Sequence, residues 1–204
     1  MELSASQTDA LTELINIGYA RAAGVLSDLS GHQIHLEVPH VAIHEVSEIT
    51  PLLQKVVQGE VASVHQVFGG PIAGDAILLL DKQAALLLNK LLTERPSSDD
   101  LDGAAREVIT EVGNIVLNAC LGVFGNLLQV QVTFTVPNLR IEHVQDVLQT
   151  LTIEAQGLQF ALMIHTRFHL KRSDFSGYLV IILSVTSLER LLAELKKWEE
   201  RQLS

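Results

Sequence analysis

The sequence predicts an α+β protein built from two similar halves that share one antiparallel sheet, with long helices packed on it. Three observations lead to this fold class. A polar motif occurs twice at one offset, each copy lies in a long segment of helical periodicity, and apolar segments typical of strands follow each helix. Two separate small sheets would leave strand edges unpaired, so we expect the halves to share a single sheet in a pseudo-two-fold arrangement.

The repeated motif is an acidic residue, a Glu four positions later, an Asn three positions after that and a Pro 23 positions after the Asn. Its copies are Asp9, Glu13, Asn16 and Pro39, and Glu107, Glu111, Asn114 and Pro137. Each residue of the second copy lies 98 positions after its counterpart. Such repetition predicts one domain made of two repeats, about 1–95 and 101–195, with a short helical extension to 204.

The first copy lies in a segment that predicts a long helix. Ser4 or Ser6 can cap its start, and Gly31 follows Ser30 at its end. Apolar residues at three- and four-residue steps form one stripe: Leu11, Leu14, Ile15, Gly18, Ala22, Val25, Leu26 and Leu29. At about 100° per residue, Glu13 points away from this stripe and Asn16 shares its exposed face. Ile17 lies beside the polar pair, nearer to solvent than an isoleucine requires.

The remainder of the first half predicts strands and one further helix. We expect strands at 32–39, 41–46, 61–68 and 76–80, a short connector or helical turn at 51–60, and a helix from Asp81 to about Leu92. Pro39 has no N–H to donate to a strand ladder, so it should lie at a strand end or a bend. The Pro- and Ser-containing segment 95–100 is a linker between the halves.

The second half repeats this order. A helix is predicted from about Asp102 to Leu127, with Glu107, Glu111, Asn114 and Asn118 on its polar face and Ile115 beside them. Strands are expected at about 129–136, 139–147, 158–169 and 178–185, with a turn at 172–177. Thr186 or Ser187 should cap a final helix that runs from Leu188 to about Gln202.

Composition restricts the class of protein and its partners. The 204 residues carry a net charge of −10, which argues against nucleic acid or an anionic membrane as a partner and suits a partner with a basic patch. The single cysteine, Cys120, cannot form an internal disulfide and is expected in the core. No signal peptide is evident, and the apolar run 178–183 is too short to cross a bilayer. We therefore expect a cytoplasmic protein that does not insert into a membrane.

The two motif copies resemble those of the CheC-type phosphatases of bacterial chemotaxis, the family of CheC, CheX and the N-terminal part of FliY. The pattern in that family is an Asp or Ser, followed by a Glu, then an Asn, and then a Pro farther downstream. Asp9, Glu13, Asn16 and Pro39 match completely, whereas Glu107 departs from the family at the leading position of the second copy. The resemblance covers nearly the whole chain, and the presence of two copies is more similar to CheC than to CheX.

The resemblance implies hydrolysis of the phospho-aspartate of a CheY-like receiver domain. The receiver holds its own Mg²⁺, so no cofactor of this chain's own is implied. Asn16 and Asn114 would position the attacking water, while Glu13 and Glu111 would pair with a lysine of the receiver. Asp9, Ile17, Glu107 and Ile115 would help to dock the partner.

Two other interpretations remain open at the level of sequence. The helices could dock a receiver, a CheD-like protein or a flagellar-switch protein without any chemistry. A metal-dependent hydrolase is the other alternative, because the chain has eight histidines. These are scattered over predicted strands without a familiar ligand spacing, and no Walker loop, G-x-S-x-G, CxxC or H-E-x-x-H motif occurs.

Overall fold

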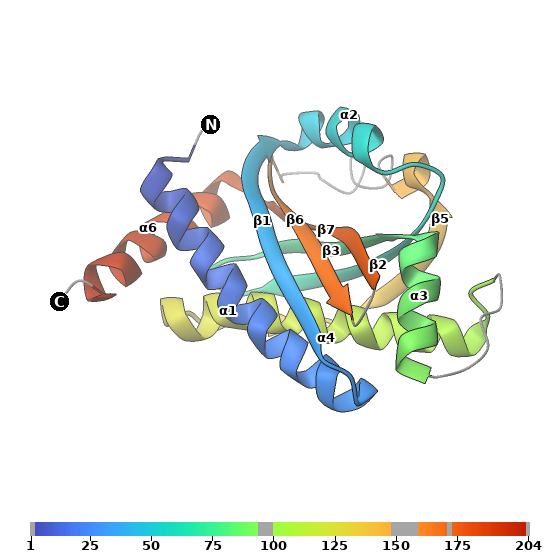
Figure 1. Ribbon diagram of the computed structural model, residues 1–204. Helices are drawn as coiled ribbons and strands as arrows, with labels where there is room; N and C mark the ends of the chain where they lie inside the picture. Colours follow the sequence, from blue (N-terminus) through green and yellow to red (C-terminus); the bar gives the residue numbers. More distant parts are fainter. Residues whose placement is uncertain (1–2, 94–99, 148–158, 171–172, 203–204) are drawn as a thin grey trace.

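The computed structural model describes residues 3–93, 100–147, 159–170 and 173–202 (Figure 1). Its centre is a seven-stranded sheet in the order β1-β6-β7-β3-β2-β4, with β5 also paired to β2. All the strand pairs are antiparallel. The strands are β1 (Ile34–Glu45), β2 (Glu60–Gly69), β3 (Gly74–Asp81), β4 (Thr133–Phe134), β5 (Asn138–His143), β6 (Phe160–Leu170) and β7 (Ser173–Leu183).

Several strand pairs join the two halves: β1 pairs with β6, and β2 pairs with both β4 and β5. β3 from the first half pairs with β7 from the second over seven residues, from Gly74 opposite Leu183 to Leu80 opposite Gly177. The predicted shared antiparallel sheet is therefore confirmed, and so is the α+β class. The predicted division into two repeats stays a prediction.

Helices cover the two faces of the sheet unequally. The larger core lies between one face and four helices, α1 (Ala5–Ser30), α3 (Lys82–Thr93), α4 (Gly103–Leu128) and α6 (Val185–Gln202). A smaller core on the other face is formed with α2 (Val46–Val56), through Ile49 and Leu53. Figure 1 shows α2 at the opposite side of the sheet from the long helices. Both motif-bearing helices thus lie on one face.

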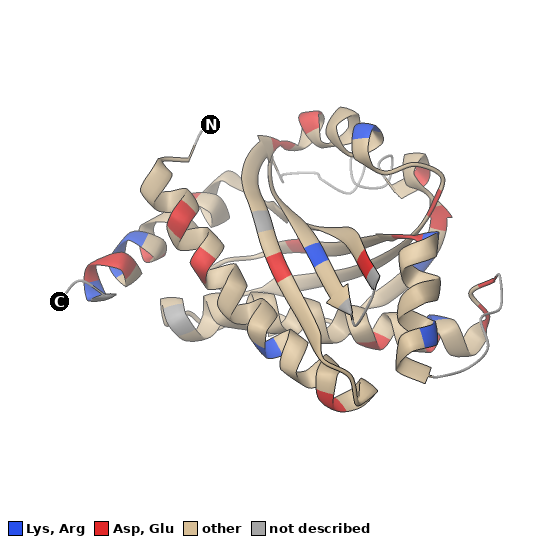
Figure 2. Cartoon of the chain, in the orientation of Figure 1, with Lys and Arg blue, Asp and Glu red and all other residues tan. Residues whose placement is uncertain are grey.

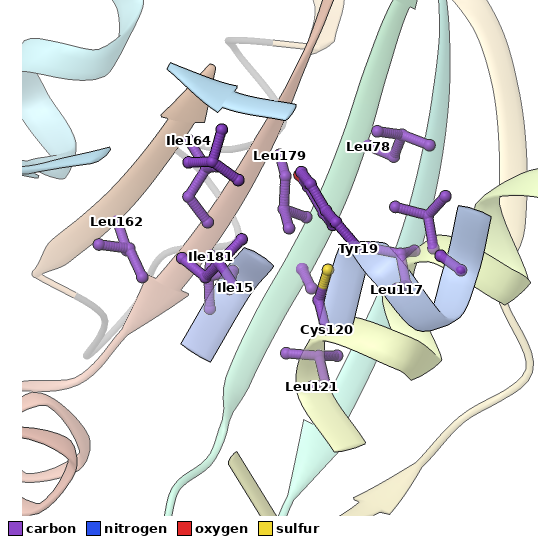
Figure 3. Packing of buried hydrophobic residues seen from close by; sticks show 14 of the residues in the cluster. Ile15, Tyr19, Leu78, Leu117, Cys120, Leu121, Leu162, Ile164, Leu179 and Ile181 are labelled. Carbon is purple, nitrogen blue, oxygen red and sulfur yellow. The ribbon is translucent and has the colours of Figure 1, made fainter. Parts of the chain in front are cut away.

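The two long helices cross in direct contact (Figure 1). At the crossing, a Cβ atom added to Gly18 would lie 2.9 Å from Cα of Cys120 and 3.0 Å from the carbonyl oxygen of Ala119. Side chains of both helices, among them Ile15 of α1 and Leu117 of α4, point toward the strands beside this crossing (Figure 3). Gly18 is needed because any side chain there would separate the two backbones.

Local signals explain how α1 begins and ends. Ser4 is the N-cap, and its side chain accepts from the backbone N–H of Gln7 while the Gln7 side chain bonds back to Ser4. Gly31 ends the helix in the left-handed conformation at φ 64°. The predicted bounds are confirmed. The predicted apolar stripe is wrong at its end, because Val25 and Leu29 are 47% and 62% exposed while Leu26 remains buried.

Both motif prolines lie at a one-residue insertion in the strand pairing. From Glu37 to His40, β1 advances three residues while β6 advances two, from Arg167 to His165. The alternation changes phase here: even positions such as Ile34 face the core before the insertion, and odd positions such as Val41 face it afterwards. A bulge is the only way to keep both apolar sets inside.

The same insertion occurs in the second half. From Phe134 to Asn138 the chain advances four residues, while the partner strand β2 goes from Phe68 to His65, which is three. Pro137 lies within this interval, as Pro39 lies within the first. A proline suits both positions because a residue at a bulge need not donate to the ladder.

Several predicted elements differ from the structure. Of the two options for 51–60, the helical one holds as far as Val56, but the helix α2 is longer than a turn and begins at Val46, with Glu45 and Glu48 forming a capping box. The strands expected at 129–136 and 139–147 are shortened to Thr133–Phe134 and Asn138–His143. The linker at 95–100 lies almost wholly outside the described residues.

The last hairpin also departs from prediction. The turn expected at 172–177 is wrong over 173–177, where Ser173 to Gly177 belong to β7. Pairing with β6 overrides the turn preference of these residues, and the ring of Phe175 stacks on that of Phe168 at 4.7 Å. The final helix begins at Val185, and it is Ser184 whose hydroxyl accepts from the N–H of Ser187.

Among the described helices, one passes the length and composition test for a membrane span. The segment Gly103–Asn126 of α4 has a mean hydropathy of 1.6, and half of its window is buried within the protein. Core helices of globular proteins commonly pass this test, so it is weak evidence for a span.

We predict that Gly18→Ala destabilises the fold and that Gly24→Ala does not. The Gly18 change forces α1 and α4 apart at a backbone contact, so the free energy of unfolding should fall by about 1–3 kcal/mol. Gly24 is on the same helix, and a Cβ atom added there would have no atom within 4 Å. Alanine at this position should therefore raise the free energy of unfolding by about 0.5–1 kcal/mol. Urea unfolding measures both; equal effects would contradict the tight crossing.

We predict that His65 makes the fold acid-sensitive. Burial, and then the charge of Arg140, lower the pKa of His65 to about 4. The unfolded state therefore binds this proton more readily, and the free energy of unfolding should fall as the pH drops from about 6.5 towards 4. Between pH 7 and pH 4.5 the loss from this group should be about 2 kcal/mol.

His65→Gln should remove that part of the pH dependence, measured as the difference between urea unfolding curves at the two pH values. His143→Gln, at an exposed histidine on the neighbouring strand β5, is the matched control. An unchanged slope in His65→Gln would show that His65 does not titrate differently on folding.

Candidate functional site

The first motif lies on the N-terminal half of α1. Asp9 and Glu13 are exposed, and Asn16 and Ile17 are half-buried. The opposite side of the helix holds it to the core through residues with no exposed surface: Leu11, Leu14, Ile15, Tyr19, Ala22 and Leu26. The motif is thus presented outward by a helix whose position is fixed by burial. Asp9 and Glu13 lie on the outward side of α1, Asn16 is half-buried, and Ile17 packs in part against the core.

The second motif occupies the matching part of α4. Glu107 and Glu111 are exposed, and Asn114 and Ile115 are half-buried. Buried residues again hold the helix down: Ile109, Val112, Val116, Leu117 and Cys120. The predicted burial of Cys120 is confirmed, and burial raises the pKa of its thiol, which suits a core residue and not a nucleophile.

The two motifs form two separate sites. Each lies before the helix crossing in its own helix: Asn16 precedes Gly18, and Asn114 precedes Ala119. In Figure 1, α1 and α4 run in opposite directions across the crossing, so the N-terminal parts of the helices diverge from it. The two Glu–Asn pairs therefore lie on different helices, on opposite sides of the crossing.

Carboxylates are prominent around both motifs. In Figure 2 the first part of α1 carries acidic side chains without a basic one between them. On α4, Arg106 stands directly before Glu107. A partner surface with a basic group would complement both sites.

A hollow of about 370 Å³ lies beside the second motif. It is lined by Glu107, Glu111, Arg106 and Thr110 of α4 and by Pro137, Asn138 and Leu139 at the start of β5. The downstream proline of the motif therefore lies next to the motif's own carboxylates, although 26 positions separate it from Glu111. The side chain of Pro39, its counterpart, lies outside the described residues.

A chain of hydrogen bonds connects Asn114 to the sheet. The Nδ2 atom of Asn118 donates to Oδ1 of Asn114 at 2.6 Å. The Nε2 atom of Gln66, on β2, donates to Oδ1 of Asn118 at 3.0 Å and to the backbone carbonyl of Thr135 at 2.9 Å. Asn118 follows Asn114 by one helical turn, so the two amides meet on one face of α4.

The amide of Gln66 is held in one orientation. Its side chain is buried, and its Oε1 atom has no hydrogen-bond partner among the described residues. An unpaired buried oxygen costs about 1–3 kcal/mol. Turning the amide over would lose both donated bonds and place Oε1 against two other oxygens, so the observed orientation is the better of the two.

The first motif has a different anchor. Position 20, which corresponds to Asn118, is an exposed alanine. The buried hydroxyl of Tyr19 instead bonds to that of Thr166 on β6, which fastens α1 to the sheet without touching Asn16. Within the described part of the chain, no side chain hydrogen-bonds the carboxamide of Asn16.

Sequence reasoning recognised Asn118 as part of a polar stripe but missed its partners. Gln66 is a lone glutamine in a predicted strand, and Thr135 contributes only a backbone carbonyl. Nothing in their spacing indicates contact with α4, because the pairing of distant strands and helices decides it. The one signal in the sequence was a polar residue, Gln66, on an otherwise apolar face of β2.

Metal ligation has no support in the described residues. Over 3–93, 100–147, 159–170 and 173–202, no group of three or more His, Cys, Asp or Glu side chains is placed to hold a metal ion. The cluster of Glu37, His169 and Asp174 is a set of hydrogen bonds across β1, β6 and β7.

Comparison with known proteins shows which folds this arrangement resembles. No family model matches the sequence. Among solved structures, FliY from Thermotoga maritima is 19% identical with a TM-score of 0.79, and the match covers 97% of this chain and 100% of that one. CheX from Desulfovibrio desulfuricans is 15% identical with a TM-score of 0.52, over 83% and 99% of the chains.

A flagellar-switch protein has the same fold. FliM from H. pylori, in its complex with FliG, is 13% identical with a TM-score of 0.68, over 94% of this chain and 100% of that one. At these identities the likeness concerns the fold. The fold implied by the resemblance of the motifs to CheC-type proteins is thereby confirmed.

We predict that the motif carboxylates can be removed without loss of stability. Glu13→Ala and Glu111→Ala replace exposed side chains, so each should change the free energy of unfolding by less than about 0.5 kcal/mol. Leu14→Ala, next to Glu13 but fully buried, should cost about 2–5 kcal/mol in the same urea experiment. A large loss of unfolding free energy in either Glu variant would mean that the motif stabilises the fold.

Proposed function

We propose that the protein hydrolyses the aspartyl phosphate of a response-regulator receiver domain of the CheY type. The observation that carries this proposal is the double presentation of an exposed Glu and a half-buried Asn, one turn apart, on two firmly packed helices. The fold shared with FliY and CheX supports it. Membership of the CheC-type phosphatases is part of the proposal.

The chemistry requires little from this chain. An aspartyl phosphate is an activated acyl phosphate, and the receiver supplies the Mg²⁺ and lysine that surround it. What remains is to hold one water in line with the phosphorus atom, so that its oxygen forms the new P–O bond while the bond to the aspartate oxygen breaks. A carboxamide can accept from and donate to this water without adding negative charge near the phosphoryl group.

Each motif residue has a part in this scheme. Asn16 and Asn114 orient the water, and their half-burial brings them to the floor of the contact. Glu13 and Glu111 reach out one turn away and pair with the receiver's lysine, which fixes the register of docking. Ile17 and Ile115 cover the contact and exclude other water, while Asp9 and Glu107 extend the acidic surface toward the partner.

The separation of the two motifs predicts how many receivers one molecule can bind. Because each Glu–Asn pair lies on its own helix and faces outward, each is a complete site for one receiver. One molecule of this protein would then serve two receivers without cooperation between its sites. The cytoplasm, where receivers are found, is the expected location.

A second candidate function is docking at the flagellar switch without catalysis. The likeness to H. pylori FliM, solved in a complex with FliG, favours it. A docking protein needs the outward faces of α1 and α4 but has no use for the two asparagine amides. Replacement of both asparagines therefore separates the two candidates.

We predict that the protein accelerates the loss of phosphate from a phosphorylated receiver of the same cell, and that Asn16→Ala combined with Asn114→Ala reduces this acceleration on the order of 100-fold. Each single replacement should leave the other site at work. The measurement is the decay of ³²P-labelled receiver with and without the protein. Asn126→Ala, at an exposed asparagine near the end of α4, is the matched control and should match wild type.

The same variants should be tested for binding to the receiver and to FliG- and CheD-like proteins. Wild-type acceleration that survives the double replacement would exclude the water-positioning role of the asparagines. No acceleration of any receiver, together with binding that the double replacement does not weaken, would establish the docking function instead.

A further inference from the structure

We propose that Asn118 and Gln66 are positioning residues that fix the orientation of the Asn114 carboxamide, which makes the second motif the preorganised one of the two. Asn114, Asn118 and Gln66 all lie among the described residues. The catalytic consequence of their arrangement rests on the function proposed above. Neither Asn118 nor Gln66 belongs to the repeated motif, since position 20, the counterpart of Asn118, is alanine.

The orientation is set at the far end of the chain of amides. The carbonyl oxygen of Thr135 can only accept, so it requires the Nε2 atom of Gln66 to face it, at 2.9 Å. The second hydrogen of that nitrogen then points to Asn118 and selects its Oδ1 atom, at 3.0 Å. Asn118 must present its nitrogen to Asn114, which therefore turns its Oδ1 atom inward, at 2.6 Å. One backbone carbonyl thus decides the direction of three amides.

The starting point is itself held firmly. The backbone N–H of Thr135 donates to the carbonyl of Val67 at 3.0 Å, and the N–H of Val67 donates to the Thr135 hydroxyl at 3.1 Å. Gln66 is only 2% exposed. The chain therefore begins in the sheet and ends at the surface of α4, where its last member is the predicted water-positioning residue.

As a result, the carboxamide of Asn114 has a fixed orientation, and its Nδ2 donor group has a fixed position. With Oδ1 of Asn114 engaged by Asn118, the two Nδ2 hydrogens and one remaining lone pair of Oδ1 are left for the docked partner. Asn16 has no such restraint among the described residues, so its amide can turn over and must be ordered when the receiver binds. Ordering before binding avoids that entropy cost and favours the step in which water attacks.

The orientation is tested without any enzyme assay by NMR relaxation of the side-chain amides in ¹⁵N-labelled protein. The order parameter of the Asn114 side-chain amide should be clearly higher than that of Asn16, which should lie below about 0.6. Asn118→Ala removes the direct contact, and Gln66→Met, of similar shape, removes the anchor two links away. Both should lower the Asn114 value toward that of Asn16, whereas Asn126→Ala should not.

The consequence for the reaction is tested in an Asn16→Ala background, where only the second site is at work. Adding Asn118→Ala or Gln66→Met should lower kcat for receiver dephosphorylation on the order of 10-fold and change KM less than about two-fold, because the amide is misoriented while the docking surface is intact. Asn126→Ala in the same background should leave both constants unchanged. Thermal unfolding of each variant confirms that the compared proteins are folded.

The two levels of the inference fail in different ways. An Asn114 order parameter that neither replacement lowers, or that equals the value of Asn16 in wild type, overturns the positioning role, whatever the activity. Lowered order with an unchanged kcat overturns its catalytic importance. If wild type accelerates no receiver, the proposed function fails, and the order parameters still decide whether Gln66 and Asn118 hold Asn114.

Discussion

The direct backbone contact between α1 and α4 at Gly18 is the constraint on which the rest of this structure depends. Strand pairs between the two halves, among them β3 with β7 and β1 with β6, make one sheet, and both long helices must bury their apolar stripes on the same face of it. They therefore compete for one surface and can share it only by crossing closely. Because each helix has a single buried side, its polar side is left outward, and the two Glu–Asn pairs become accessible as a result of packing.

The other face of the sheet shows what happens where no long helix lies. Under α2 it is apolar, through residues such as Ile77 and Val180. Farther along β1, β6 and β7 this face carries ionisable groups. Hydrogen bonds to Glu37 and Asp174 raise the pKa of His169. The same hydrogen bond from His169 lowers the pKa of Glu37. Glu37 and Asp174 are 52% and 68% exposed and His169 is 33% exposed, so solvent screens their interactions and they contribute little to stability. The difference between the two faces follows directly from the unequal cover.

Sequence was sufficient for what is local or periodic. The bounds of α1, the outward position of Glu13 and Asn16, and the burial of Cys120 all follow from a 3.6-residue period and a capping box. It failed where partners far apart in the chain decide: residues 173–177 have turn propensity but pair with β6. The contact of Gln66 with Asn118 depends on how β2 lies under α4, which no spacing records. The family resemblance correctly indicated the fold at an identity of 19% or less, because the motif itself is short and spatially compact.

A one-residue bulge, as at Pro39 and Pro137, changes which side chains of the strand face the core. Before the bulge at Pro39, even-numbered residues of β1 such as Ile34 face the core, and after it odd-numbered residues such as Val41 do. After Pro137, Leu139 and Ile141 pack against the core, whereas Phe134 and Val136 before it are exposed. Deleting one residue there would restore continuous pairing yet send every later apolar side chain to the wrong face of the sheet. Insertions and deletions are thus tolerable at these points only in compensating pairs. The proline common to both motif copies therefore has a role in the register of the strand. This role does not depend on any chemistry performed by the Glu and Asn that precede it.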